Sequence, residues 1–213
     1  MNGNAQEPGK KAPGAPDPKC APLGRGLRLC ADLHTHSLVS AHAYSTIEEC
    51  VRSAAEIGLE LIANTDHGPS LADGAHPWHF NNLRVLPRIW HGVALLRGIE
   101  ANVLPGGRLD PEIEMRTLKR LDVVIASFHN CYPPASKAEH TRDLLRIIAE
   151  GQVDILGHLG NPDYPIDEEE VLGRAAEAGM ALELNATSDV NTRPGSTPGC
   201  VRLAKIAATL KMP

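Results

Sequence analysis

The segment "DLHTHSLVSAHAYS" at residues 32–45 holds three histidines whose side chains can bind metal ions. They are His34, His36 and His42. His34 and His36 are two residues apart, so in a strand both side chains point to the same face of the sheet. In a helix the same spacing would turn them about 200° apart. The pattern therefore predicts that the end of a strand presents both imidazoles to a common partner.

Similar side chains follow four later apolar runs of the sequence: His67, Glu100, His129 and His158. Neutral imidazole and carboxylate are preferred ligands of Zn²⁺, Mn²⁺ and Fe²⁺, and their mixture excludes an all-oxygen Ca²⁺ or Mg²⁺ site. One tetrahedral ion cannot use so many ligands. We therefore expect more than one metal ion, with Glu100 as a bridging ligand rather than a buried ion-pair partner.

Five other residues could contribute to such a site or be structural. Asp66 either orients a ligand or has a structural role, and the sequence leaves these roles equally open. His76 and His79 are interpreted as ordinary loop residues that could border the pocket. His91 and His140 are expected on helices, at the surface.

The elements that must position these side chains alternate regularly. Each apolar run predicts a strand, at residues 27–36, 59–67, 93–103, 122–130, 153–161 and 180–187. Helix starts are indicated by the capping boxes Ser45-x-x-Glu48 and Ser136-x-x-Glu139 and by the caps Asp110 and Asp167. The expected helices cover 45–58, 79–92 with a break near Pro87, 110–121, 136–151, 167–179 and 198–211.

Strand, loop and helix repeated about six times predict parallel strands joined by crossover helices. The two solutions are an open doubly wound sheet and a closed barrel. In both, functional residues gather at the carboxyl ends of the strands. Dinucleotide-binding and P-loop glycine motifs do not occur in the sequence.

Composition bounds the class of protein. At 213 residues with 42% hydrophobic residues, the chain suits one globular domain, expected at 25–213. Residues 1–24, rich in Pro, Gly, Ala and Lys, predict a disordered extension without a secretory signal. The net charge of −5 argues against nucleic-acid and membrane partners. Five scattered cysteines favour reduced thiols and a cytoplasmic location. Homo-oligomerisation is possible but has no signature.

Five stretches together resemble a known family: "DLHTHSLVSAHAYS", "NTDHGP", "HFNNLRVLPRIWHGVALLRGIEAN", "ASFH" and "GHLGNPDYPID". They look like the PHP (polymerase and histidinol phosphatase) superfamily, and within it the compact YcdX-like phosphatases. The similarity runs from about residue 29 to the end, in order. It implies a distorted (β/α)7 barrel that resembles a TIM barrel, with a trinuclear centre that often holds zinc.

The resemblance also implies a role for each candidate ligand. It implies three metal positions. His34 and His36 would hold the first metal ion, His129 and His158 the second, and His42 and His67 the third. Glu100 would bridge the first and second ions. Up to three Zn²⁺ ions are expected, with Mn²⁺ or Fe²⁺ as alternatives.

The sequence departs from the family pattern in one respect. The family carries an Asp-x-His pair at the end of a seventh strand, and this motif does not occur here. We therefore expect the last β–α unit of the barrel to be missing from this chain, which would be C-terminally truncated. The first and sixth strands would then have open edges.

The function implied is that of a metal-dependent phosphatase acting on small phosphomonoesters. The nucleophile would be a metal-bound water, with no protein nucleophile. Arg193 is the candidate phosphate contact, because guanidinium pairs with phosphate through two hydrogen bonds. Two alternatives stay open: another metallohydrolase of the amidohydrolase type, which also begins with H-x-H, and a catalytically impaired metal-binding fragment.

Overall fold

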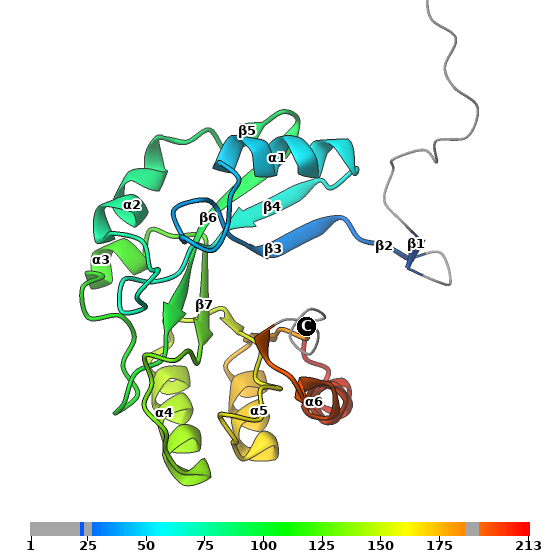
Figure 1. Ribbon diagram of the computed structural model, residues 1–213. Helices are drawn as coiled ribbons and strands as arrows, with labels where there is room; N and C mark the ends of the chain where they lie inside the picture. Colours follow the sequence, from blue (N-terminus) through cyan, green and yellow to red (C-terminus); the bar gives the residue numbers. More distant parts are fainter. Residues whose placement is uncertain (1–21, 24–26, 186–191) are drawn as a thin grey trace, which may run out of the picture.

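The computed structural model describes residues 22–23, 27–185 and 192–213, and its centre is a curled sheet of seven strands (Figure 1). The rest of the predicted N-terminal extension lies outside the described residues. Two short strands, β1 (Pro22–Leu23) and β2 (Leu27–Arg28), form a separate antiparallel pair. The strands of the main sheet are β3 (Ala31–Thr35), β4 (Leu61–Asn64), β5 (Ile89–Trp90), β6 (Val93–Asn102), β7 (Val123–Ser127), β8 (Ile155–Leu156) and β9 (Ala181–Leu182).

Six of these strands run parallel in the order β3-β4-β6-β7-β8-β9, which confirms the predicted α/β fold. Because sequential parallel strands are neighbours, their carboxyl ends meet at one edge of the sheet. Only β5 is antiparallel, and it pairs with the start of β6. The parallel order of the other six strands brings together the polar residues at their carboxyl ends.

The long strand β6 curls the sheet by changing partners along its length. Its first part pairs with β4 through Ala94 to Arg97, and its second part pairs with β7 from Gly98 onward. A Cβ atom at Gly98 would lie 2.7 Å from Thr65 Cγ2 and 2.8 Å from the Val123 carbonyl oxygen. A glycine is therefore needed where the two neighbouring strands approach β6 from opposite sides.

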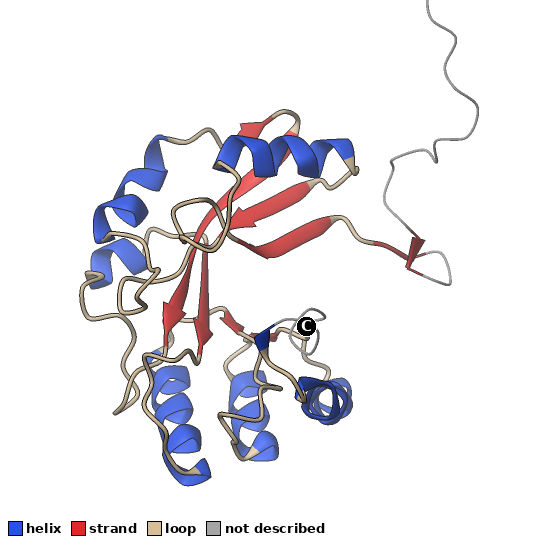
Figure 2. Cartoon of the chain, in the orientation of Figure 1, coloured by secondary structure: helices blue, strands red, loops and turns tan. Residues whose placement is uncertain are grey.

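The helices lie on the outer side of the curled sheet (Figure 2). They are α1 (Ile47–Glu56), α2 (Pro77–Asn82), the 3₁₀ helix η1 (Leu83–Val85), α3 (Met115–Leu118), α4 (Lys137–Glu150), α5 (Glu168–Glu177) and α6 (Ser196–Leu210). The main core includes Ile99 of β6, Leu144 of α4, Leu172 of α5 and Leu203 of α6. This apolar layer fixes the strands whose ends carry the polar cluster.

The sheet does not close among the residues that the structure describes. Strand β3 pairs with β4 only, and β9 with β8 only. The carbonyl oxygen of Pro213 accepts a hydrogen bond from the Leu182 N–H, at 3.2 Å, beside β9. The two end strands are joined at their carboxyl ends by a contact of 2.7 Å between His34 Nδ1 and Glu183 Oε1. Within the described ranges, no helix is both long and apolar enough to cross a membrane.

One predicted helix, 110–121, is wrong over most of its length, and another, 79–92, is helical only before its predicted break near Pro87. In the segment 79–92, α2 and η1 end at Val85, and β5 then turns into β6 through His91 and Gly92, both with positive φ. In the segment 110–121, only α3 is helical. The Asp110 carboxylate does not start a helix there, because it accepts hydrogen bonds from the backbone N–H and side-chain amide of Asn102.

The first helix begins one residue later than predicted. Its N-cap is Thr46, and the capping box is formed with Glu49 instead of Ser45 with Glu48. The predicted caps Ser136 of α4 and Asp167 of α5 are confirmed. Gly151 ends α4 in the left-handed conformation that favours glycine.

Candidate metal centre

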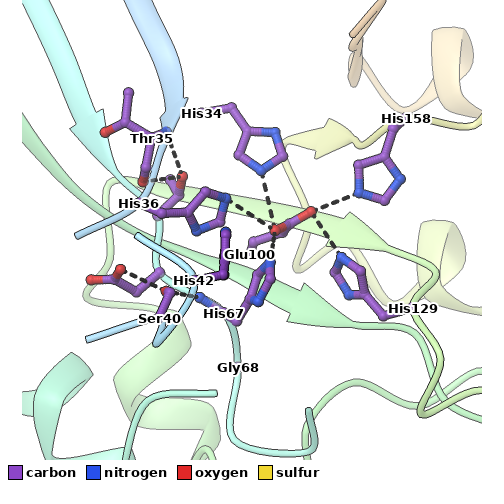
Figure 3. A network of polar contacts seen from close by, with 12 residues as sticks. His34, Thr35, His36, Ser40, His42, His67, Gly68, Glu100, His129 and His158 are labelled. Carbon is purple, nitrogen blue, oxygen red and sulfur yellow. Dashed lines mark hydrogen bonds and ion pairs between the residues drawn. The ribbon is translucent and has the colours of Figure 1, made fainter. Parts of the chain in front are cut away.

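Glu100, near the end of β6, lies at the centre of a cluster of histidines (Figure 3). The residue is 1% exposed. The carboxylate contacts five imidazole Nε2 atoms: His67 at 2.9 Å, His34 at 3.2 Å and His36 at 3.4 Å from Oε2, and His158 at 2.8 Å and His129 at 3.3 Å from Oε1. Five of the six predicted imidazole ligands thus meet around the carboxylate of the seventh predicted ligand, Glu100.

The strands place these rings as the sequence spacing predicts. His34 lies in β3 and His36 follows it, and both rings reach the same Glu100 oxygen. His67 is held beside Glu100 by an isolated parallel bridge between the two residues. His158 follows β8 with a φ of 33°, a strained value for a residue other than glycine. Its N–H donates to Glu183 Oε2 at 2.9 Å.

His42, the seventh predicted ligand, lies at the side of the cluster and not against Glu100. Its ring centre is 5.0 Å from that of His36 and 4.7 Å from that of His67. The described residues contain three groups whose ligand atoms lie within 4.8 Å of one another: His34 with His36 and Glu100, His67 with Glu100 and His129, and His36 with His42 and His67.

Four of the imidazoles are held from behind through their Nδ1 atoms. Glu183 contacts the Nδ1 of His34 at 2.7 Å, and the Asn102 side-chain oxygen contacts that of His129 at 2.8 Å. The Asp73 carboxylate contacts the Nδ1 atoms of both His42 and His67. In all four contacts the partner of the Nδ1 atom is a side-chain oxygen. A ring that donates its Nδ1–H to an outer oxygen keeps its Nε2 lone pair free for a metal ion.

These outer partners were missed by the sequence reasoning, which assigned no role to Asp73, Asn102 or Glu183. Glu183 follows β9, and its position at a strand end was a usable signal. Asn102 ends β6 two residues after Glu100, so its side chain shares the face of Glu100. Asp73 lies in an irregular loop, where periodicity gives no signal.

Asp66, for which the sequence left a ligand-orienting and a structural role open, holds the loop that carries His36 and His42. Its buried carboxylate accepts hydrogen bonds from the N–H and hydroxyl of Ser37, at 2.7 and 2.8 Å, and from the Ser40 hydroxyl at 2.7 Å. The His79 Nε2 atom lies 3.0 Å from Asp66 Oδ2. Burial alone would raise the pKa of Asp66, but these hydrogen bonds lower it. The carboxylate thereby fixes the loop between His36 and His42.

The charges of the cluster are strongly coupled. Burial disfavours the Glu100 carboxylate, but the surrounding imidazoles hold its pKa well below the usual range. Burial likewise opposes a charged His34, yet the neighbouring Glu100 and Glu183 carboxylates raise its pKa to about 10. Burial lowers the pKa of His36 to about 3 and that of His158 to about 4. Some rings therefore carry a positive charge beside the Glu100 carboxylate, while others stay neutral.

The donor set fits a transition metal ion. Nitrogen atoms of neutral imidazoles and a carboxylate are the ligands preferred by Zn²⁺, Mn²⁺ and Fe²⁺. Glu100 Oε2 and His129 Nε2 are buried atoms that lack a hydrogen-bond partner of good geometry among the described residues. Such buried atoms are rare unless another group binds them. The residues present thus match the chemistry of a metal centre.

A cavity of about 680 Å³ opens over the cluster. Its lining includes Asn130, Tyr164 and Arg193 together with the imidazoles. The structure thus places Arg193, the predicted phosphate contact, in the same cavity as the candidate ligands.

The remaining histidines have other surroundings. His76 caps α2, where its Nδ1 accepts the Trp78 N–H at 3.1 Å. His91 lies in the β5–β6 turn, not on a helix. His140 of α4 was predicted at the surface, and this is wrong, because it is fully buried. It packs against the ring of Phe128, and its Nδ1 lies 3.0 Å from the Pro165 carbonyl oxygen.

Comparisons with known proteins agree with the resemblance to the PHP superfamily. The PHP domain profile matches residues 32–187. A protein from Shewanella baltica named "Probable phosphatase" is 51% identical over 177 residues, which cover 82% of this chain and 68% of that protein. Another probable phosphatase, from a Shewanella species, is 50% identical over 187 residues, which cover 86% of this chain and 73% of that protein.

Among solved structures, a histidinol phosphate phosphatase from Lactococcus lactis, complexed with zinc, L-histidinol and phosphate, superimposes with a TM-score of 0.47. The identity is 17%, and the match covers 81% of each chain. The profile match spans more than half of the sequence, and the Shewanella proteins match at about half identity over most of the chain. The chain therefore belongs to the PHP domain family.

Proposed function

We propose that this chain is a metal-dependent phosphatase that hydrolyses small phosphomonoesters. The observation that carries the proposal is the buried Glu100 carboxylate, within 3.4 Å of five imidazole Nε2 atoms at the carboxyl ends of parallel strands. Membership of the PHP family and the names of the Shewanella relatives support the same chemistry.

The three groups of ligand atoms support a centre of up to three ions, for which Zn²⁺ is the first candidate and Mn²⁺ or Fe²⁺ the alternatives. In this proposal His34, His36, His42, His67, Glu100, His129 and His158 are the metal ligands. When bound, such cations lower the pKa of a coordinated water and offset negative charge on a phosphoryl group. We assign no protein nucleophile.

The protein's own residues orient and bind. Asn102 and Glu183 fix the rings of His129 and His34 from behind, so that the Nε2 atoms face Glu100. Arg193 lies in the same cavity, where a guanidinium can bind two phosphoryl oxygens at once. The cavity volume of about 680 Å³ lies in the range of small-molecule sites, which supports a small ester as the substrate.

The test is metal-dependent hydrolysis of p-nitrophenyl phosphate by the purified chain. Metal-free protein should be inactive, and added Zn²⁺ or Mn²⁺ should restore turnover. Glu100→Gln should lower kcat by more than about 100-fold, because it removes the charged ligand shared by the centre.

Glu177→Gln is the matched control, since Glu177 pairs with Arg174 on the exposed face of α5. It should leave both turnover and metal dependence unchanged. Hydrolysis that persists in metal-free protein, or a Glu100→Gln variant with full activity, would contradict the proposal. Turnover of an amide or lactone but not of the phosphate ester would favour an amidohydrolase-type reaction instead.

A further inference from the structure

One carboxylate outside the ring around Glu100 contacts two of the candidate ligands at once. Asp73 Oδ2 lies 2.8 Å from the Nδ1 of His42, and Asp73 Oδ1 lies 3.2 Å from the Nδ1 of His67. The two imidazoles lie 4.7 Å apart with an angle of 27° between their planes. Asp73 therefore holds these two rings nearly parallel, side by side.

The contacts determine which nitrogen of each ring carries the proton. A carboxylate only accepts hydrogen bonds, so each Nδ1 facing Asp73 must carry a hydrogen. In a neutral imidazole the Nε2 is then unprotonated and has a lone pair available. For His67 this atom is the one that lies 2.9 Å from Glu100 Oε2. The carboxylate thus selects, in two rings, the tautomer that a metal ion requires.

Asp73 contributes to the cluster and little to the core. It lies in the loop before α2, and its side chain is 30% exposed. The described contacts of its carboxylate are with the two imidazoles. Asp73 belongs to none of the three groups of ligand atoms that lie close together.

We propose that Asp73 is a positioning residue that sets the tautomer and orientation of His42 and His67 together, and so creates the metal position these two rings share. The inference rests on the metal centre of the proposed function. It adds a residue to that centre that neither the spacing of the histidines nor the comparisons assign. Without Asp73, each ring is free to turn and to move its hydrogen to Nε2.

The test is Asp73→Asn in the full chain, because asparagine has nearly the same shape. Its amide oxygen can accept one Nδ1–H, but its NH₂ group faces the other ring and requires an unprotonated Nδ1 there. The hydrogen of that ring then moves to Nε2, which can no longer bind a metal ion. Asp163→Asn is the matched control, since it removes one negative charge from the same cavity.

The first readout is zinc affinity, measured by competition with a chromogenic chelator. We expect the weakest zinc site of the wild type to lose affinity by about 10-fold to 100-fold in Asp73→Asn, the range typical of partners behind metal ligands. Asp163→Asn should bind zinc as the wild type does. The second readout is the tautomer of His42 and His67 from ¹H–¹⁵N correlation spectra of the imidazoles. One of the two rings should change from Nδ1–H to Nε2–H.

Unchanged zinc affinity with unchanged tautomers in Asp73→Asn would overturn the inference. Loss of zinc without any change of tautomer would also overturn it, because Asp73 would then act as a ligand itself. Both readouts are independent of turnover. A zinc-loaded wild type that does not hydrolyse phosphate esters would therefore refute the proposed function while leaving the assignment of Asp73 to be decided by these two measurements.

Discussion

Glu100 is a charged group in a position that ordinarily excludes charge. Burying a carboxylate costs several kcal/mol unless partners compensate it. Here the surrounding imidazoles compensate it, and among them His34 has a pKa raised to about 10. A bound metal cation can replace the proton that gives an imidazole its positive charge. At the scale of single residues, the cluster is thus prepared for positive charge.

Substitution of Arg193 tests its proposed contact with the phosphoryl group of the substrate. Because it would bind the phosphoryl group and not the metal ions, Arg193→Ala should raise KM by about 10-fold or more, while metal content stays unchanged. Arg193→Lys should recover part of the loss, since lysine keeps the charge but not the two-pronged geometry. Steady-state kinetics with Arg174→Ala as the surface control would measure this. An unchanged KM in Arg193→Ala would remove Arg193 from the site.

Asp143 gives a pH-dependent contribution to stability that lies outside the metal cluster. Its buried Oδ2 accepts hydrogen bonds from the Tyr132 hydroxyl and the Gly106 N–H, both at 2.8 Å. Burial would raise the pKa of this carboxyl, but these hydrogen bonds and Arg142 lower it. A lowered pKa in the folded state means that the ionised form stabilises the fold above the unfolded pKa. This contribution is lost as the pH falls through the folded value.

Asp143→Asn should therefore be less stable than the wild type at pH 7, by about 1–2 kcal/mol. The difference should shrink as the pH is lowered below about 4, because the unfolded wild-type carboxyl is protonated first and the folded carboxyl only at a lower pH. Urea unfolding of the metal-free proteins across this range would measure it. A difference in the free energy of unfolding that stays constant down to pH 3 would contradict the assigned charge.

Among the helices, capping residues in the sequence predicted the starts of α4 and α5 correctly. They failed where a tertiary hydrogen bond uses the side chain that would otherwise cap a helix. Ser136 and Asp167 cap α4 and α5 as predicted. Asp110 carries the same kind of signal, but Asn102 and the N–H of Ser70 use its carboxylate instead. Two adjacent hydroxyls, Ser45 and Thr46, each precede a glutamate by three residues, so the sequence does not decide between them.

Gly157 links strand packing to the site, because it immediately precedes His158. A Cβ atom at this position would lie 2.2 Å from the Ser127 hydroxyl oxygen and 2.9 Å from Ile125 Cγ2, both on β7. Gly157→Ala should therefore push β8 away from β7 and destabilise the protein by about 1–3 kcal/mol. Zinc affinity should fall as well, since His129 and His158 follow these two strands.

Ser127→Ala provides the control for Gly157→Ala. The buried Ser127 hydroxyl has no hydrogen-bond partner among the described residues, so its removal alone should cost little. In the double variant it should restore part of the stability and zinc affinity lost in Gly157→Ala. Thermal unfolding and chelator competition would measure both. A double variant no better than Gly157→Ala would show that the Ser127 hydroxyl is not the obstacle.

At the scale of the whole molecule, the site exists because parallel strands end at one edge of a curled sheet. The sequence was sufficient to predict this convergence, since each strand end carries a histidine or a carboxylate. It was not sufficient to predict Asp73 or the contact between Glu183 and His34, which spans 149 residues along the chain. Such contacts depend on how far the sheet curls, and hydrophobic periodicity does not record its curvature.

Elemental analysis of the chain, purified without added metal, would show directly whether the cluster around Glu100 binds metal ions. We expect a bound transition metal, between about one and three ions per chain, that is lost in Glu100→Gln and retained in Glu177→Gln. A wild-type chain without transition metal, which also fails to take up Zn²⁺ or Mn²⁺ after purification, would rule out a metal centre at this cluster. Equal metal content in the wild type and Glu100→Gln would place the metal somewhere other than this cluster.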